Sequence, residues 1–287
     1  MRSVGMLCAA LAALGASAAF GQEPEPDASG SWALGLATQV DEESNDSRLV
    51  TFNWGVTPKT WLSFAAGRSS SDQANVTADT LVAAVDRRFD RVGIAFEVEH
   101  WGDPDALESK DLRGTFYVAS DRFRIGFSYE RRDIDVPFTL TGPLGRTISR
   151  HVGVGADGVA VDVRVRPAER WQLYFGATEN DYERDLSVLP RIDRLNALST
   201  STLTLANSFV DHVRMFAAER EVGRALVNVS YTEDESAVDG SRFETLDAAV
   251  LFPVGARVDV EVNVGNGRSD FFGSGLYGGV LLLVYGR

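Results

Sequence analysis

Cysteine and long apolar segments are both scarce in this chain of 287 residues. The single cysteine, Cys8, lies in an N-terminal stretch with a short apolar core over residues 7–14 and small residues up to position 21. This order is typical of a cleaved secretory signal peptide, and the core is too short to span a membrane. We therefore expect residues 1–21 to be removed and the mature chain to have neither disulfides nor thiolate chemistry.

Basic residues are also in the minority, with 28 lysines and arginines against 41 aspartates and glutamates. The formal charge is −13, and removing Arg2 with the leader lowers it by one to −14. Nucleic-acid binding requires a basic surface, so we expect no nucleic-acid partner. The acidic, proline-containing residues 22–30 predict a disordered lead-in, and residues 31–287 are expected to form one domain.

After the leader no run of about 18 apolar residues occurs, so we expect no transmembrane helix. The chain alternates instead between apolar and polar residues. The clearest example joins two such stretches through a tight connection at residues 167–170, with apolar positions at Val159, Val161, Val163, Val165, Trp171, Leu173 and Phe175. A period of two predicts β-strands with one apolar face, and the tight connection predicts an antiparallel hairpin.

This pattern predicts fourteen strands between residues 31 and 285, one of them lying somewhere in residues 202–218. Six short connections alternate with seven long ones, and the longest are expected at 133–155 and 180–200. A soluble secreted β-sandwich is the alternative to a barrel. Uniform strand lengths and the segregation of long and short connections favour the barrel. Aromatic residues near the strand ends point the same way, at Trp61, Phe89, Phe123, Trp171 and Phe252 by the short turns and at Trp101 and Tyr129 towards the other rim.

Stretches such as Val258-Asp259-Val260-Glu261-Val262 and the hairpin through Pro167 resemble the Gram-negative outer-membrane β-barrel proteins, over essentially the whole region after the leader. The resemblance implies a single transmembrane antiparallel up-and-down β-barrel of about 14 strands, porin-like, with short periplasmic turns and long external loops. It also implies export to the cell outer membrane. The partners it implies are outer-membrane lipid, lipopolysaccharide and the barrel-assembly machinery, with a monomer by default. Members of the class usually end on an aromatic residue, whereas here Tyr285 lies two residues before the end.

If the apolar residues face lipid, those between them face the interior, and many of these are charged. The candidate pore-lining residues are Glu97, Glu99, Arg113, Arg122, Arg124, Arg132, Asp162, Arg164, Arg166, Asp247, Asp259 and Glu261. We expect a basic strip on the sixth to eighth strands to face an acidic strip on the twelfth and thirteenth, across a polar pore. The alternative is a plugged interior in which neighbouring arginines and glutamates pair across strands.

The three histidines, His100, His151 and His212, are dispersed, so we expect no metal site, no cofactor and no enzymatic activity. Asp211 and His212 are neighbours in an expected strand, so their side chains should point to opposite faces. For the acidic residues at 233–235, and for Asp270 with Asn266, we expect a solvated acidic loop, with a calcium site at the external rim as the alternative.

The sequence therefore predicts a passive porin-like channel for small polar or charged solutes. One alternative is a plugged barrel that acts through its external loops as an adhesin or export partner. A weaker alternative is a membrane-embedded lipid enzyme.

Overall fold

The computed structural model describes residues 29–42, 45–71, 76–103, 107–141, 147–183, 209–237, 240–269 and 273–286. The predicted signal peptide and most of the predicted lead-in lie outside these residues. No helix in the described ranges is long and apolar enough to cross a membrane. The fourteen strands are β1 (Trp32–Asp41), β2 (Asp46–Thr57), β3 (Thr60–Ser71), β4 (Val76–Phe89), β5 (Val92–Asp103), β6 (Leu107–Ala119), β7 (Phe123–Thr141), β8 (Thr147–Ala168), β9 (Trp171–Tyr182), β10 (Val210–Val222), β11 (Ala225–Ser236), β12 (Arg242–Pro253), β13 (Val258–Ser269) and β14 (Gly273–Gly286).

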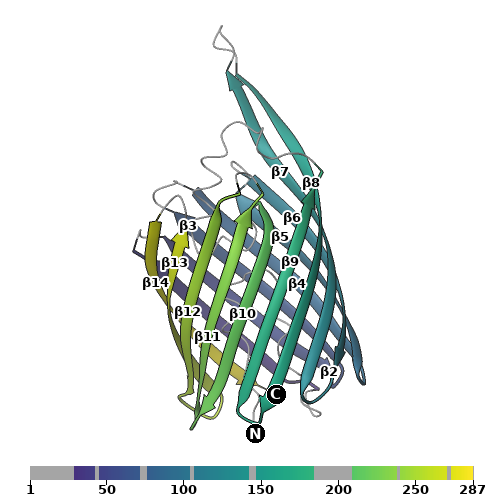
Figure 1. The fold of residues 1–287 in the computed structure, drawn as a ribbon, viewed down its shortest axis with the longest axis vertical. Helices are drawn as coiled ribbons and strands as arrows, with labels where there is room; N and C mark the ends of the chain where they lie inside the picture. The colour runs from purple at the N-terminus through teal and green to yellow at the C-terminus, as the bar shows by residue number, and fades with distance from the viewer. Residues whose placement is uncertain are drawn as a thin grey trace.

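Each strand pairs with its neighbours in sequence, and β1 pairs with β14, so the sheet closes into a barrel (Figure 1). All of the strand pairs are antiparallel, which confirms the predicted up-and-down topology. Trp32 at the start of β1 faces Gly286 at the end of β14. An even number of strands therefore places the first strand's beginning and the last strand's end at one rim, the rim with the six short turns.

The long connection predicted at 133–155 is largely absent. β7 and β8 instead run for 19 and 22 residues and extend well above the rim as a paired hairpin (Figure 1). Their pairing is continuous from Phe123 opposite Val165 to Thr141 opposite Thr147. The prediction was wrong because the apolar alternation continues through Ile134, Val136, Phe138 and Leu140, a period of two that is typical of a strand and was assigned to a loop. The second predicted connection, at 180–200, begins after β9, and residues 184–208 lie outside the described ranges.

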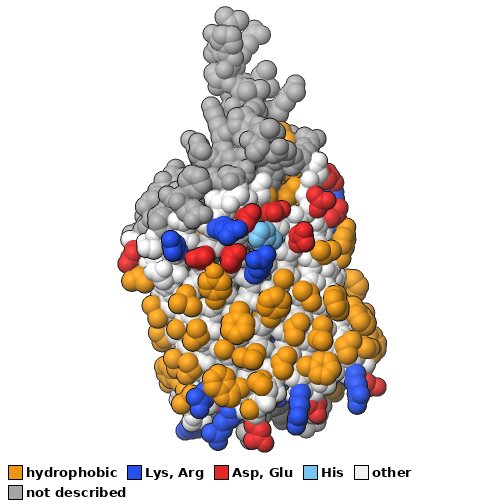
Figure 2. Space-filling model, in the orientation of Figure 1, with side chains coloured by type: hydrophobic (Ala, Val, Ile, Leu, Met, Phe, Trp, Pro, Cys, Tyr) orange, Lys and Arg blue, Asp and Glu red, His pale blue; other side chains and the backbone are white. Residues whose placement is uncertain are grey.

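The outer face carries a continuous apolar belt, with charged side chains above and below it (Figure 2). Every strand contributes at least one exposed large apolar residue. One from each strand in order is Leu36, Phe52, Phe64, Leu81, Phe96, Leu112, Phe127, Val159, Phe175, Phe216, Val229, Leu246, Val262 and Val280. A belt that runs around a closed barrel fits a lipid environment, because water would make its exposure costly. This excludes the β-sandwich alternative.

The predicted aromatic residues at the strand ends divide between the two faces. Phe89, Phe123, Trp171, Phe252 and Tyr129 are exposed on the outside. By contrast, Trp101 is only 3% exposed, and Trp61 has the same parity as the buried Ser63, so neither lies on the outer face. Their assignment to an outer girdle was wrong, since alternation puts each of them on the inner face.

The inner face is apolar near the seam where the barrel closes. Leu281 and Leu283 of β14 are 1% and 0% exposed and cluster with Leu49 and Leu251. β14 is therefore apolar on both faces, which explains its unbroken run of apolar residues near the end. Two of the predicted lining residues, Asp259 and Glu261 of β13, lie beside this apolar cluster, because they pair with Leu283 and Leu281.

Candidate functional site

The structure places most of the predicted pore-lining residues on the inner face, where they alternate with the outward apolar residues. Eight of the twelve are buried, namely Glu97, Glu99, Arg124, Arg132, Arg164, Asp247, Asp259 and Glu261. Arg113 is 14% exposed at its side chain, and Asp162 and Arg166 are half-buried. Arg122 differs from the others, because it lies in the turn before β7 and its side chain is exposed.

Arg113 and Arg132 belong to a cluster of buried ion pairs that spans β5, β6 and β7. The register sets Arg113 of β6 opposite Glu97 of β5 and Glu130 of β7. The Arg113 guanidinium forms an ion pair with Glu130 and lies 4.0 Å from Glu97 Oε1. Arg132 contacts Asp111 Oδ2 at 3.2 Å and Glu130 Oε1 at 2.8 Å. We call these five residues the β5–β7 ion-pair cluster.

This cluster changes the predicted charge pattern. Arg113 and Arg132 were expected in a basic strip that faces acidic residues across the barrel. Both instead pair with carboxylates on adjacent strands, as the alternative interpretation proposed. Cross-strand pairs of opposite charge stabilise the wall that carries them. These two arginines therefore contribute to the wall, and the basic surface of the inner face lies elsewhere.

Tyr117 connects four strands on the side of the β5–β7 ion-pair cluster that faces the rim with the short turns. Its ring lies over Gly93 of β5, where a Cβ atom would overlap the ring. Its hydroxyl reaches past β5 and donates a 2.6 Å hydrogen bond to Asp86 Oδ1 of β4. On the other side the guanidinium carbon of Arg124 lies 4.1 Å from the ring centre, a cation–π arrangement. The position of Arg124 is thus determined by β4, β5 and β6 as well as by its own strand.

Arg124 and Arg164 form the basic part of the inner face. They are directly opposite each other on β7 and β8, and each is 7% exposed. Like charges at paired positions repel, so acidic groups nearby are required to hold them together. The Glu219 carboxylate of β10 interacts electrostatically with Arg164 and also with Glu261 of β13. Glu219 therefore lies between the basic residues of β8 and the acidic residues of β13.

The acidic side of the inner face extends over β11, β12 and β13. Asp234, Asp247, Asp259 and Glu261 come from these strands, and all four are buried. Asp247 accepts a hydrogen bond from the Tyr277 hydroxyl of β14. The Tyr277 ring lies over Gly265 of the intervening strand, so this arrangement repeats that of Tyr117. The inner face therefore carries basic groups on β7 and β8 and acidic groups on β10 to β13.

Several of these residues were absent from the prediction. Asp86, Tyr117 and Glu219 all occupy inward positions that the alternation of their strands already specifies. Tyr117, for example, lies between the outward Phe116 and Val118. The alternation of apolar and polar positions was therefore sufficient to predict that these side chains point inward. The partner of each residue required the register between strands, which the sequence does not show.

No family model matches this sequence, and no curated protein matches it. Solved structures do resemble the fold. CymD, a monoaromatic hydrocarbon channel, gives a TM-score of 0.52 at 8% identity, over 90% of this chain and 88% of CymD. A loop-deletion mutant of OmpT, an outer membrane protein of Vibrio cholerae, gives 0.50 at 10% identity, over 91% and 100%.

CdiB from Acinetobacter baumannii gives a TM-score of 0.51 at 6% identity. The match covers 89% of this chain but only 60% of CdiB, so this chain spans about three fifths of that protein. At these identities the likeness concerns the fold alone, and it agrees with the closed barrel described above.

Proposed function

We propose that this protein is a passive channel of the outer membrane for small polar or charged solutes, and that it is not an enzyme. In this proposal the chain is exported by its leader and inserted by the barrel-assembly machinery. It functions as a monomer in contact with outer-membrane lipid and lipopolysaccharide. The apolar belt on all fourteen strands supports this placement.

One observation carries the proposal: charged side chains of both signs line the inner face, with a pair of arginines on β7 and β8 and a group of carboxylates on β12 and β13. Arg124 and Arg164 lie on β7 and β8, while Asp247, Asp259 and Glu261 lie on β12 and β13. Opposed charges across a narrow polar passage create a transverse field that orients charged and zwitterionic solutes. A barrel of fourteen strands is intermediate between filled barrels of about eight and open porins of about sixteen to eighteen.

Arg124 and Arg164 are the residues on which ion selectivity should depend most. Arg113 and Arg132 are neutralised by carboxylates on adjacent strands, so their field at a distance is small. Arg124 stacks on the Tyr117 ring and lies directly opposite Arg164, so two positive charges are concentrated at one level of the inner face. We therefore expect the double variant Arg124→Ala/Arg164→Ala to shift the channel towards cations.

The test is the reversal potential of the refolded full chain in a planar bilayer with a salt gradient. Discrete conductance steps are expected for the wild type, with a measurably more cation-selective reversal potential for the double variant. Arg122→Ala is the matched control. Arg122 lies two residues before Arg124, in the turn that precedes β7, and its side chain is exposed. It should leave selectivity unchanged. Equal shifts for the control and the double variant, or no shift for either, would remove the two arginines from the pathway.

A closed barrel that acts through its external surface is the second candidate, and the β5–β7 ion-pair cluster favours it. Buried pairs between Arg113, Arg132 and Glu130 hold a wall together without offering charge to a solute. A silent bilayer, from protein shown to be folded by its heat-modifiable migration on gels, would establish this candidate over the channel.

A further inference from the structure

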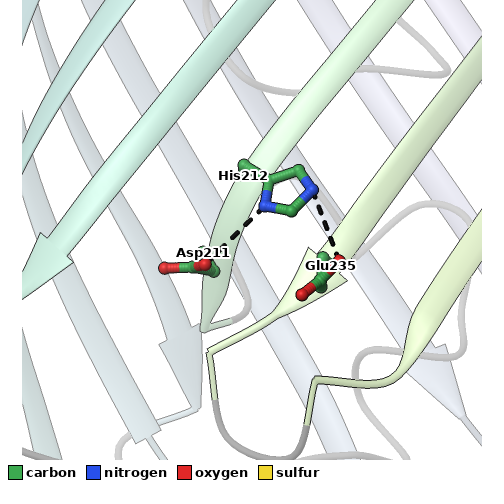
Figure 3. Close-up of side chains that lie close together, drawn as sticks. All are labelled: Asp211, His212 and Glu235. Carbon is green, nitrogen blue, oxygen red and sulfur yellow. Dashed lines mark ion pairs between the residues drawn. The ribbon is translucent and has the colours of Figure 1, made fainter.

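A histidine and two carboxylates converge on the outer surface of β10 and β11, away from the inner face. Figure 3 shows Asp211 and Glu235 on either side of the His212 ring. His212 Nδ1 lies 3.6 Å from Asp211 Oδ2, and His212 Nε2 lies 3.4 Å from Glu235 Oε2. One potential ligand atom from each residue can be chosen so that all three lie within 4.8 Å of one another.

A β-bulge brings Asp211 and His212 together. Val210 pairs with Ser236 and His212 pairs with Glu235, so Asp211 is an extra residue in β10. Neighbours in a regular strand point to opposite faces, and a bulge removes that alternation locally. The prediction that Asp211 and His212 point to opposite faces was therefore wrong.

The bulge is held by contacts from β9. The carbonyl of Val210 accepts hydrogen bonds of 2.9 Å from Asn180 Nδ2 and from the Tyr182 hydroxyl. On the other side, the backbone N–H of Ala237 donates a 2.8 Å hydrogen bond to the carbonyl of Phe209. These bonds fix the backbone immediately before Asp211, and the pairing of His212 with Glu235 fixes it immediately after. The relative positions of Asp211 and His212 are therefore set in advance of any ligand.

His212 and Glu235 already have the spacing that a small divalent cation requires, whereas Asp211 faces the other ring nitrogen and its side chain must turn to join them. A tetrahedral zinc site has bonds of about 2.0–2.2 Å, so its ligand atoms lie about 3.3–3.6 Å apart. The separation of 3.4 Å between His212 Nε2 and Glu235 Oε2 already falls in this range. The side chains of Asp211, His212 and Glu235 are 49%, 24% and 24% exposed, so an ion can enter from outside and water can complete its coordination.

The chemistry of the three groups narrows the choice of ion. One imidazole nitrogen with two carboxylate oxygens suits zinc and similar transition metals, whereas calcium and magnesium prefer oxygen ligands alone. The calcium site suggested at residues 233–235 does not form in this manner. Asp234 is buried on the inner face, while Glu233 and Glu235 point outward.

We propose that Asp211, His212 and Glu235 bind a divalent transition-metal ion, with zinc as the representative, at the outer rim between β10 and β11. Bound there, the ion links the bulge of β10 to the end of β11 and stabilises this part of the rim. For these three residues, this proposal takes the place of the expectation, drawn from the sequence, that the chain has no metal site. The inference does not rest on the proposed channel.

Arg242 provides a specific signature of metal binding. Its Nε lies 3.3 Å from Glu235 Oε2, the same oxygen that faces His212. A metal ion must compete with this guanidinium for the carboxylate. If the cluster only stabilises the rim through ion pairs, Arg242→Ala weakens it. If the cluster binds a metal, Arg242→Ala raises the metal affinity.

The experiment is calorimetric titration of zinc chloride into the refolded, untagged mature chain in detergent, without chelators. The wild type is expected to bind one ion, and zinc should raise its unfolding temperature by mass action. His212→Ala should weaken binding by about tenfold or more, because ligand and supporting groups of metal sites have effects of at least this size. Glu235→Gln should do the same, and Arg242→Ala should tighten binding.

His100→Ala is the matched control. His100 Nε2 lies 3.9 Å from Glu108 Oε1, a histidine–carboxylate pair outside the cluster. This variant should bind zinc like the wild type. The proposal is overturned if the folded wild type binds no zinc, or if His212→Ala binds zinc as tightly as the wild type. Because the titration requires no current, it can fail while the channel proposal stands, and the reverse also holds.

Discussion

Arg113 contacts carboxylates from both neighbouring strands while only 14% of its own side chain is exposed. Its partners Glu97 and Glu130 are each 4% exposed at their side chains. Buried ion pairs add little net stability compared with apolar residues of the same size, but removing one member leaves the other desolvated and unpaired. At the scale of single residues, the loss of Arg113 is therefore expected to destabilise the inner wall.

We predict that Arg113→Ala lowers the free energy of unfolding by about 3–5 kcal/mol, because buried Glu97 loses its counter-ion and Glu130 keeps only Arg132. Urea titration of the refolded protein in lipid vesicles measures the change. Arg68→Ala is the control. Arg68 forms an exposed pair with Asp79 at 2.6 Å, and such pairs contribute about 0–1 kcal/mol. Equal losses for the two variants would contradict the assignment of Arg113 to a buried cluster.

The link between β4 and β6 depends on the absence of a side chain on β5. Tyr117 can reach Asp86 only because Gly93 leaves room for the ring. The same relation joins Tyr277 of β14 to Asp247 of β12 across Gly265. Two separate groups of three strands are thus held by a tyrosine that crosses a glycine, and each link adds to the backbone hydrogen bonds between adjacent strands.

At the scale of these elements, Gly93→Ala should displace the Tyr117 ring and weaken its hydrogen bond to Asp86. We expect a loss of about 1–3 kcal/mol in the free energy of unfolding, the usual effect of inserting a methyl group into packed surroundings. Gly265→Ala should behave alike. Gly275→Ala serves as the control, because a Cβ atom there has no neighbour within 4 Å. The measurement is denaturant titration. Equal losses of stability for all three variants would disprove the arrangement in which each tyrosine crosses a glycine.

The apolar belt is a property of the whole barrel, since each strand supplies only a few of its residues. Phe127 lies in the middle of the belt on β7 and is 61% exposed. Phe123 lies at the turn end of the same strand, and Arg131, paired with Glu183 at 2.6 Å, lies beyond the belt at the other side. Phe123 and Phe127 therefore lie at two different depths of the apolar belt on the same strand.

We predict that Phe127→Lys lowers stability in lipid vesicles by about 2–4 kcal/mol, whereas Phe123→Lys lowers it by about 0–1 kcal/mol, because the cost of a charge falls from the midplane to the interface. Phe127→Ala separates the loss of apolar area from the effect of charge. In detergent micelles the difference between the two lysine variants should shrink. Equal losses of stability for Phe127→Lys and Phe123→Lys in vesicles would refute a membrane-spanning belt.

The sequence by itself determined the number of strands, the approximate limits of most of them, the closed up-and-down order expected of them and the face on which side chains of the regular strands lie. All of these follow from a period of two, which is a local property of the chain. Even where the prediction failed for Trp61 and Trp101, the parity of the neighbouring residues contained the correct answer.

Only the tertiary structure decided which residues meet. The pairing of Arg113 with Glu130, the reach of Tyr117 over Gly93 and the electrostatic contact of Glu219 with Arg164 all depend on the register between strands. The bulge at Asp211 likewise depends on the pairing of β10 with β11 and has no counterpart in the alternation of the sequence. A period of two gives the direction of side chains in a regular strand, but their partners are fixed only when two strands are held at one register.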